Sequence, residues 1–136
     1  MLDIKFIRDN SDVVKYAAQK KHIDIDIDRL LAVDEERRSI MTDLEQQKAE
    51  QNRVSGEIAQ IADAAAKQEK IAEMQALKEK IQALEEKLRP VMEEWQKLML
   101  QVPNVPDMSV PDGASDAENQ EVKQWGEQPT FSFSAK

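Results

Sequence analysis

The stretch that decides the fold is residues 74–102, MQALKEKIQALEEKLRPVMEEWQKLMLQV. Its apolar residues recur every three or four positions without a slip, at Met74, Leu77, Ile81, Leu84, Leu88, Val91, Trp95, Leu98 and Val102. This spacing places one apolar stripe along a helix and is typical of a coiled coil. Pro90 lies inside the stripe and should bend or loosen the helix locally. Because Pro103 and Pro106 follow the stripe, we expect the helix to end at Val102.

A second apolar stripe with the same spacing precedes it, starting near Asp28. Its positions are Leu30, Val33, Arg37, Ile40, Leu44, Gln47, Gln51, Val54, Ile58 and Ile61. The three polar members could fix the register of the pair, or they could mark a looser stretch of rod. Between the stripes the apolar pattern lapses, so we place a turn within residues 62–69. A single continuous helix with a stutter is the alternative, but it would need an outside partner along its whole length.

The charges favour the hairpin. With Leu30 taken as heptad position a, the following g positions of the first helix are all acidic, at Glu36, Asp43, Glu50 and Glu57. On the second helix Lys80 and Lys87 hold position g. In an antiparallel pair g faces g, which predicts the bridges Glu50–Lys80 and Asp43–Lys87. Each such bridge contributes under about 1 kcal/mol, so the bridges set orientation more than stability.

The flanking segments complete an all-α prediction. Residues 1–23 start with alternating apolar positions and then form a short helix, capped by Asn10 or Ser11, that buries Val13, Val14, Ala17 and Ala18. The alternating residues 23–28 form an extended link into the first long helix, which is capped near Asp26 or Asp28. We therefore expect a helical-hairpin domain at 1–102, with the short helix packed at its base. Residues 103–136 should form an extended connector with a strand-like end at 130–133.

The composition restricts the class of protein. The chain has 136 residues, 19 Lys or Arg against 27 Asp or Glu, a net charge of −8 and no cysteine. A disulfide framework and a cysteine-based zinc site are excluded. No apolar run approaches the roughly 20 residues that span a bilayer, and the N-terminus lacks the order of a signal peptide. We expect a cytoplasmic protein with neither a membrane nor DNA as partner.

The residues for catalysis are few. The single histidine, His22, follows Lys20 and Lys21, where a helix-capping or simply exposed role is the better interpretation. There is no Gly-rich phosphate loop and no nucleophile with a recognisable base. The carboxylates at helical spacing form a solvated face rather than a ligand cluster, at Glu85, Glu86, Glu93 and Glu94. We expect this chain alone to catalyse nothing and to hold no cofactor.

Basic side chains on the predicted rod are the candidate binding residues. The first helix offers three that lie away from its acidic g positions, and the turn and second helix offer three more. The six candidates are Arg38, Lys48, Arg53, Lys67, Lys70 and Lys78. A rod with such side chains could rest against an RNA backbone and recognise its shape. The alternative is that they only keep a coiled coil in solution.

The order of several short motifs resembles one family. These motifs are MLDIKFIRDN (residues 1–10), IDIDRLLAVDEERR (25–38), QNRVS (51–55), LQVPNVP (100–106), SVP (109–111), EVKQWG (121–126) and PTFSF (129–133). Together with the heptad hairpin between them, they resemble the N-terminal region of bacterial-type seryl-tRNA synthetases. The resemblance implies an arm that lies against the long variable arm of serine tRNA. It also implies a class II catalytic domain beyond residue 136, a homodimeric parent enzyme, and ATP and Mg²⁺ as its cofactors.

A second hypothesis is a stand-alone coiled-coil hairpin that binds proteins, such as an adaptor or a prefoldin-like chaperone module. It would use apolar residues near the ends of the hairpin, such as Met99 and Leu100. The segment after residue 102 distinguishes the two hypotheses. An adaptor has no need of the ordered motifs from Pro103 to Gly126, whereas a connector to a catalytic domain has.

Overall fold

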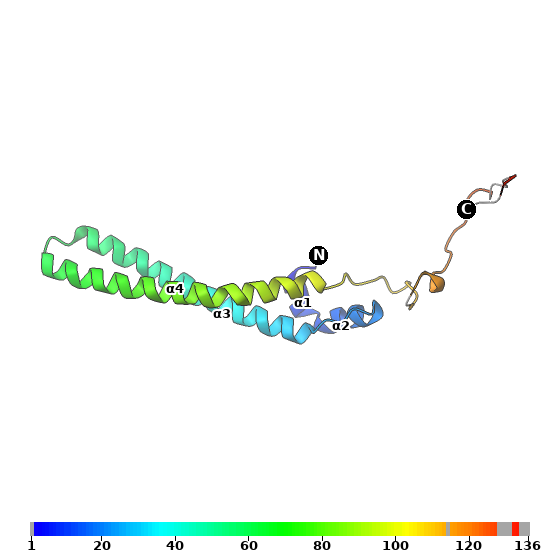
Figure 1. The fold of residues 1–136 in the computed structure, drawn as a ribbon, viewed down its shortest axis with the longest axis horizontal. Coiled ribbons are helices and arrows are strands. Elements are labelled where there is room, and N and C mark those ends of the chain that lie inside the picture. The colour runs from blue at the N-terminus through cyan, green and yellow to red at the C-terminus, as the bar shows by residue number, and fades with distance from the viewer. Residues whose placement is uncertain (1, 114, 128–131, 134–136) are drawn as a thin grey trace.

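The computed structural model describes residues 2–113, 115–127 and 132–133, and it shows an elongated rod (Figure 1). Four α-helices follow one another among these residues: α1 (Ile4–Asp9), α2 (Ser11–Lys20), α3 (Ile27–Gln60) and α4 (Ala64–Gln101). A single turn of 3₁₀ helix, η1, covers Asp116–Glu118. α3 and α4 run antiparallel side by side and form the rod, with α1 and α2 at one end (Figure 1). The predicted all-α fold, built on a two-helix hairpin, is confirmed.

The two apolar stripes form the interface of the hairpin. Every stripe position in α3 and α4 is buried or half-buried, and Leu30 and Val54 are fully inaccessible. A fully buried Val, Leu or Ile contributes about 1.5–3 kcal/mol relative to an exposed one. Because these contacts repeat along the interface, it is their sum that holds the two helices together.

The turn of the hairpin is shorter and earlier than predicted. Only residues 61–63 separate α3 from α4, so most of the predicted range 62–69 is helical. The carboxylate of Asp63 accepts a hydrogen bond from the Ala66 backbone N–H at 3.2 Å and caps α4. The alanines that follow Asp63 are strong helix formers and extend α4 back to the turn.

The two predicted interhelical bridges are not formed within the described residues. The ion pairs that do cross between the arm helices are Arg29–Glu94 at 2.7 Å, Lys48–Glu85 at 2.8 Å and Lys70–Glu57 at 3.1 Å. Arg29 and Glu94 both occupy position g, so the antiparallel g–g rule holds although the predicted partners were wrong. Glu50 fails to reach Lys80 because it pairs with Arg53, one turn along its own helix.

The base of the rod contains a core to which all four helices contribute. Its buried residues are Ile7, Val14, Ile27, Leu30, Met99 and Val102. Two short helices lie here where one was predicted, because Asp3 caps a separate α1 by accepting from the Lys5 backbone N–H. Packing of α1 and α2 against the ends of α3 and α4 fixes this end of the arm.

Two details of α2 differ from the prediction. Asn10 occupies its N-cap position, but the Asn10 side chain makes no capping bond; its amide donates to the carbonyl of Phe6 at 3.1 Å. Val14, Ala17 and Ala18 are buried as predicted, whereas Val13 is 42% exposed. Val13 turns outward because α2 packs through one face only.

The link from α2 to α3 is extended, as predicted, and Asp26 caps α3 through a 2.9 Å bond from the Arg29 N–H. His22 ends α2 in the left-handed conformation, with φ of 53°. The Ile23 N–H donates to the Ala18 carbonyl and the His22 N–H to the Gln19 carbonyl. This pair of bonds is a Schellman motif, a position where glycine is usual.

α4 continues through Pro90 and ends at Gln101, as expected from the prolines that follow. The connector then passes the C-terminal end of α2 (Figure 1), where the Lys20 ammonium donates to the Val110 carbonyl at 2.5 Å and lies 3.6 Å from Asp112. The strand-like segment predicted at 130–133 falls half outside the described residues. Among the described helices, none combines the length and apolarity required to cross a bilayer.

We predict that His22→Gly stabilises the fold by about 0.5–1 kcal/mol. The left-handed conformation costs a non-glycine residue roughly 1–2 kcal/mol, and glycine removes this cost. Glycine also loses more conformational entropy on folding, which offsets the gain by about 0.5–1 kcal/mol. Urea unfolding measures the difference. Lys21→Gly is the matched control, since Lys21 has φ of −96° and glycine should destabilise there. A lower midpoint for His22→Gly would contradict the capping geometry.

Candidate nucleic-acid interface

The basic residues of α3 are engaged by carboxylates. Arg38 lies 3.2 Å from Asp34, and Lys48 lies 2.8 Å from Glu85 across the hairpin. Arg53 contacts both Glu50 and Glu57, which precede and follow it by one turn. The prediction that Arg53 lies away from the acidic g positions is therefore wrong, because a side chain at position c reaches its g neighbours three and four residues away.

A buried carboxylate at the base accounts for Arg38. Asp34 is fully inaccessible and lies 2.8 Å from Arg37 and 3.8 Å from Arg8 of α1, in addition to Arg38. The Arg37 guanidinium also stacks over the Trp95 ring, 4.8 Å from its centroid. Sequence reasoning missed Asp34; the available signal was the Arg37-Arg38 pair three and four residues after it. The group ties α1 to the arm.

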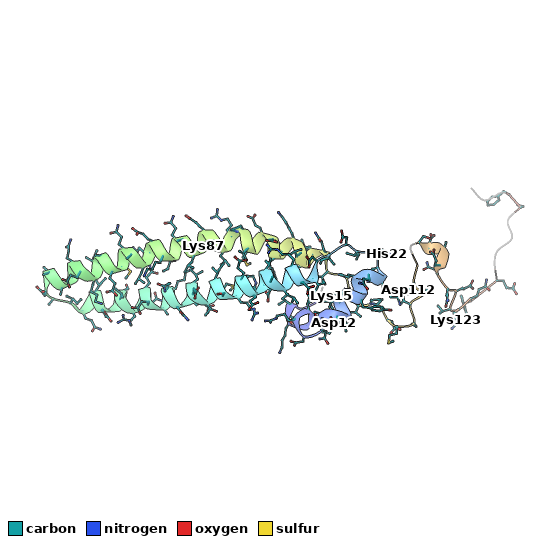
Figure 2. All side chains as sticks on the ribbon, turned by 90° about the horizontal axis from the view of Figure 1, so that it is seen from below. Asp12, Lys15, His22, Lys87, Asp112 and Lys123 are labelled. Atoms are coloured by element: carbon teal, nitrogen blue, oxygen red, sulfur yellow. The ribbon has the colours of Figure 1, made fainter. Side chains whose placement is uncertain are left out.

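The basic residues of α4 are mostly not paired. Lys70 contacts Glu57 and Glu73, so it resembles the cations of α3. Lys67 and Lys78 form no ion pair with any described residue, and the same is true of Lys80, Lys87, Arg89 and Lys97. Figure 2 shows Lys87 on α4, midway along the arm, where its side chain is exposed. The unneutralised cations of the arm therefore belong to α4, and of the six predicted candidates only Lys67 and Lys78 are among them.

Pairing with an arginine also lowers the pKa of two carboxylates. The hydrogen bond from Arg53 holds the pKa of Glu50 below its ordinary value of 4.5. The hydrogen bond from Arg29 likewise lowers the pKa of Glu94. Both carboxylates are ionised at neutral pH and paired with their arginines. The net charge that each pair presents to another anion is therefore small.

The described residues contain no group of three or more His, Asp or Glu side chains arranged to hold a metal ion. His22 has a structural role in the cap of α2. What the arm offers is a long, polar, exposed surface (Figure 2), suited to contact along an extended partner.

Comparison with known proteins assigns the fold to a family. The sequence model described as "Seryl-tRNA synthetase N-terminal domain" matches residues 1–106. The chain belongs to this family. Serine–tRNA ligases of Symbiobacterium thermophilum and Caldanaerobacter subterraneus subsp. tengcongensis are 42% and 46% identical to the whole chain. The chain spans about a third of the length of these curated relatives, 32% in each case.

A solved structure supports the same family assignment. Seryl-tRNA synthetase from Pyrococcus horikoshii, crystallised in complex with ATP, superimposes on 93% of the chain with a TM-score of 0.72 at 25% identity. The match covers 29% of that structure. The chain therefore corresponds to about a third of the serine–tRNA ligases that it matches.

For this synthetase domain we predict that Arg53→Gln raises the pKa of Glu50 toward 4.5, measured by NMR titration of the side-chain carboxyl carbon. Because the folded-state pKa is lowered, the pair contributes stability that is present above the ordinary carboxylate pKa and is lost as the pH falls through the lowered value. In the variant, the free energy of unfolding should lose the part of its pH dependence that comes from Glu50.

Lys80→Gln is the control, and it should leave the titration of Glu50 unchanged. The opposite pattern, in which Lys80→Gln moves the pKa of Glu50 and Arg53→Gln does not, would restore the bridge predicted from the sequence. It would also leave Glu57 as the partner of Arg53.

Proposed function

We propose that this domain is the arm by which a seryl-tRNA synthetase binds and positions serine tRNA, through the long variable arm of that tRNA. The observation that carries the proposal is that the whole chain matches about a third of serine–tRNA ligases, on a fold that is mostly an exposed rod. Two long helices packed against each other leave most of their side chains free for a partner. The domain would supply selection and positioning, not chemistry.

The chemistry would belong to the remaining two thirds of the longer enzyme. We propose that this region activates serine with ATP and Mg²⁺ and transfers it to the tRNA, and that it forms the homodimer. ATP has a precedent in the Pyrococcus horikoshii enzyme, which was crystallised with it. The setting would be the cytoplasm.

Among the six predicted contacts, the charge pairing supports Lys67 and Lys78 over the other four. Phosphate binding releases counterions, so a cation already matched to a carboxylate gains less from it than an unpaired one. Arg38, Lys48, Arg53 and Lys70 would serve the arm by holding its shape. No observation favours the alternative of a stand-alone protein-interaction or prefoldin-like module.

The proposal is tested by titrating the chain, at low and stated salt, with serine tRNA and with the same tRNA lacking its long variable arm. We expect tighter binding of the intact tRNA, because the arm would recognise shape and backbone along the extra helix. A linear fall of log K with log salt should accompany binding.

Equal binding of the two RNAs would contradict recognition of the variable arm. Failure to bind either RNA would contradict an autonomous RNA-binding arm. A transfer RNA with a short variable arm, titrated over the same concentration range, serves as the control for non-specific attraction.

A further inference from the structure

The two sides of the hairpin differ in composition. A residue that follows a stripe position lies on one side of the apolar interface, and a residue that precedes one lies on the other. The ion pair Lys48–Glu85 joins two residues that follow stripe positions, and Arg29–Glu94 joins two that precede them. The same division therefore applies to both helices.

One side, which we call the carboxylate side, consists of the residues that precede stripe positions. It contains six acids, Glu36, Asp43, Glu50, Glu57, Glu73 and Glu94. Its unpaired cations face these acids: Lys80 and Lys87 of α4 line one groove with Asp43 of α3. A phosphate backbone would meet an acid near each lysine on this side.

The other side, which we call the glutamine side, consists of the residues that follow stripe positions. On α4 a row recurs every seven residues, at Gln75, Gln82, Arg89 and Gln96, and all of these side chains are exposed. The one acid of α4 on this side, Glu85, is neutralised by Lys48. Lys78, beside the row, and Arg89, within it, form no ion pair with any described residue. These two cations exceed the unneutralised acids of α4 on this side, although Glu79 follows Lys78 directly.

The middle of the row is hollowed. Gln75, Lys78 and Gln82 line a groove of about 380 Å³ with Ile71, Met74 and Glu79. The amide nitrogen of Gln82 donates to Glu86 at 3.0 Å, which leaves its amide oxygen free to accept. Amides of this kind can donate to phosphate oxygens and exchange hydrogen bonds with ribose 2′-hydroxyls, and an ammonium adds the charge.

We propose that the RNA backbone lies along the glutamine side of α4, centred on Gln75, Lys78 and Gln82, and avoids the carboxylate side. The proposal rests on the proposed function and specifies its contact surface. Successive members of the row are about 10 Å apart along the helix. An extended backbone can therefore engage several of them without any base being read.

Lys78→Glu and Lys80→Glu provide the test, measured as affinity of the chain for serine tRNA over a range of salt. They make the same charge change two residues apart on α4 but on opposite sides. Lys78→Glu should weaken binding about tenfold or more and reduce the salt slope by about one. Lys80→Glu should change affinity less than about twofold, with helicity of both variants checked by circular dichroism.

The double variant Gln75→Glu and Gln82→Glu extends the test, since glutamate keeps the helix propensity and replaces neutral amides by charges that repel phosphate. It should also weaken binding. Equal losses for Lys78→Glu and Lys80→Glu, or a larger loss for Lys80→Glu, would overturn the proposed surface while leaving RNA binding intact. Absence of binding by the unaltered chain would instead overturn the proposed function.

Discussion

The antiparallel packing of the two apolar stripes is the constraint on which the rest of the structure depends. It turns two helices, each too polar to be stable alone, into a rod whose interface is continuous from Leu30 at the base to Ile61 at the turn. Because the stripes occupy one face of each helix, most of the side chains outside them are exposed along the rod beyond its base. The same packing decides which charged side chains meet across the hairpin and which are left over.

The distribution of charge follows from that packing. Cations of α3 find carboxylates on their own helix or across the hairpin, as Arg53 and Lys48 do. At the base, burial of Asp34 draws three arginines inward and fixes α1 against the arm. Most cations of α4 form no ion pair with any described residue, in contrast to those of α3. The net charge of the chain therefore does not describe the charge pairing of its individual helices.

The sequence was sufficient for the hairpin and for the end of α4, since each rests on local spacing or on prolines. It narrowed the cap of α3 to Asp26 or Asp28, and the structure shows that Asp26 is the cap. It was insufficient for the bridges, because Glu50 has a nearer partner in Arg53 on its own helix and pattern matching across helices ignores such competition. The separate α1 depends on tertiary packing of Ile7 at the base. Among the candidate contacts, Lys67 and Lys78 could be recognised as unpaired only after the ion pairs were known.

Lysine footprinting tests the central claim most directly: that one side of this arm carries the RNA. The chain is labelled with an amine-reactive reagent, with and without serine tRNA, and labelling is measured at each lysine by mass spectrometry. The account predicts that the tRNA protects Lys78 while Lys80 and Lys87, on the carboxylate side, keep their reactivity. Protection of Lys80 and Lys87 with Lys78 unchanged would contradict it, as would the absence of protection anywhere on α4.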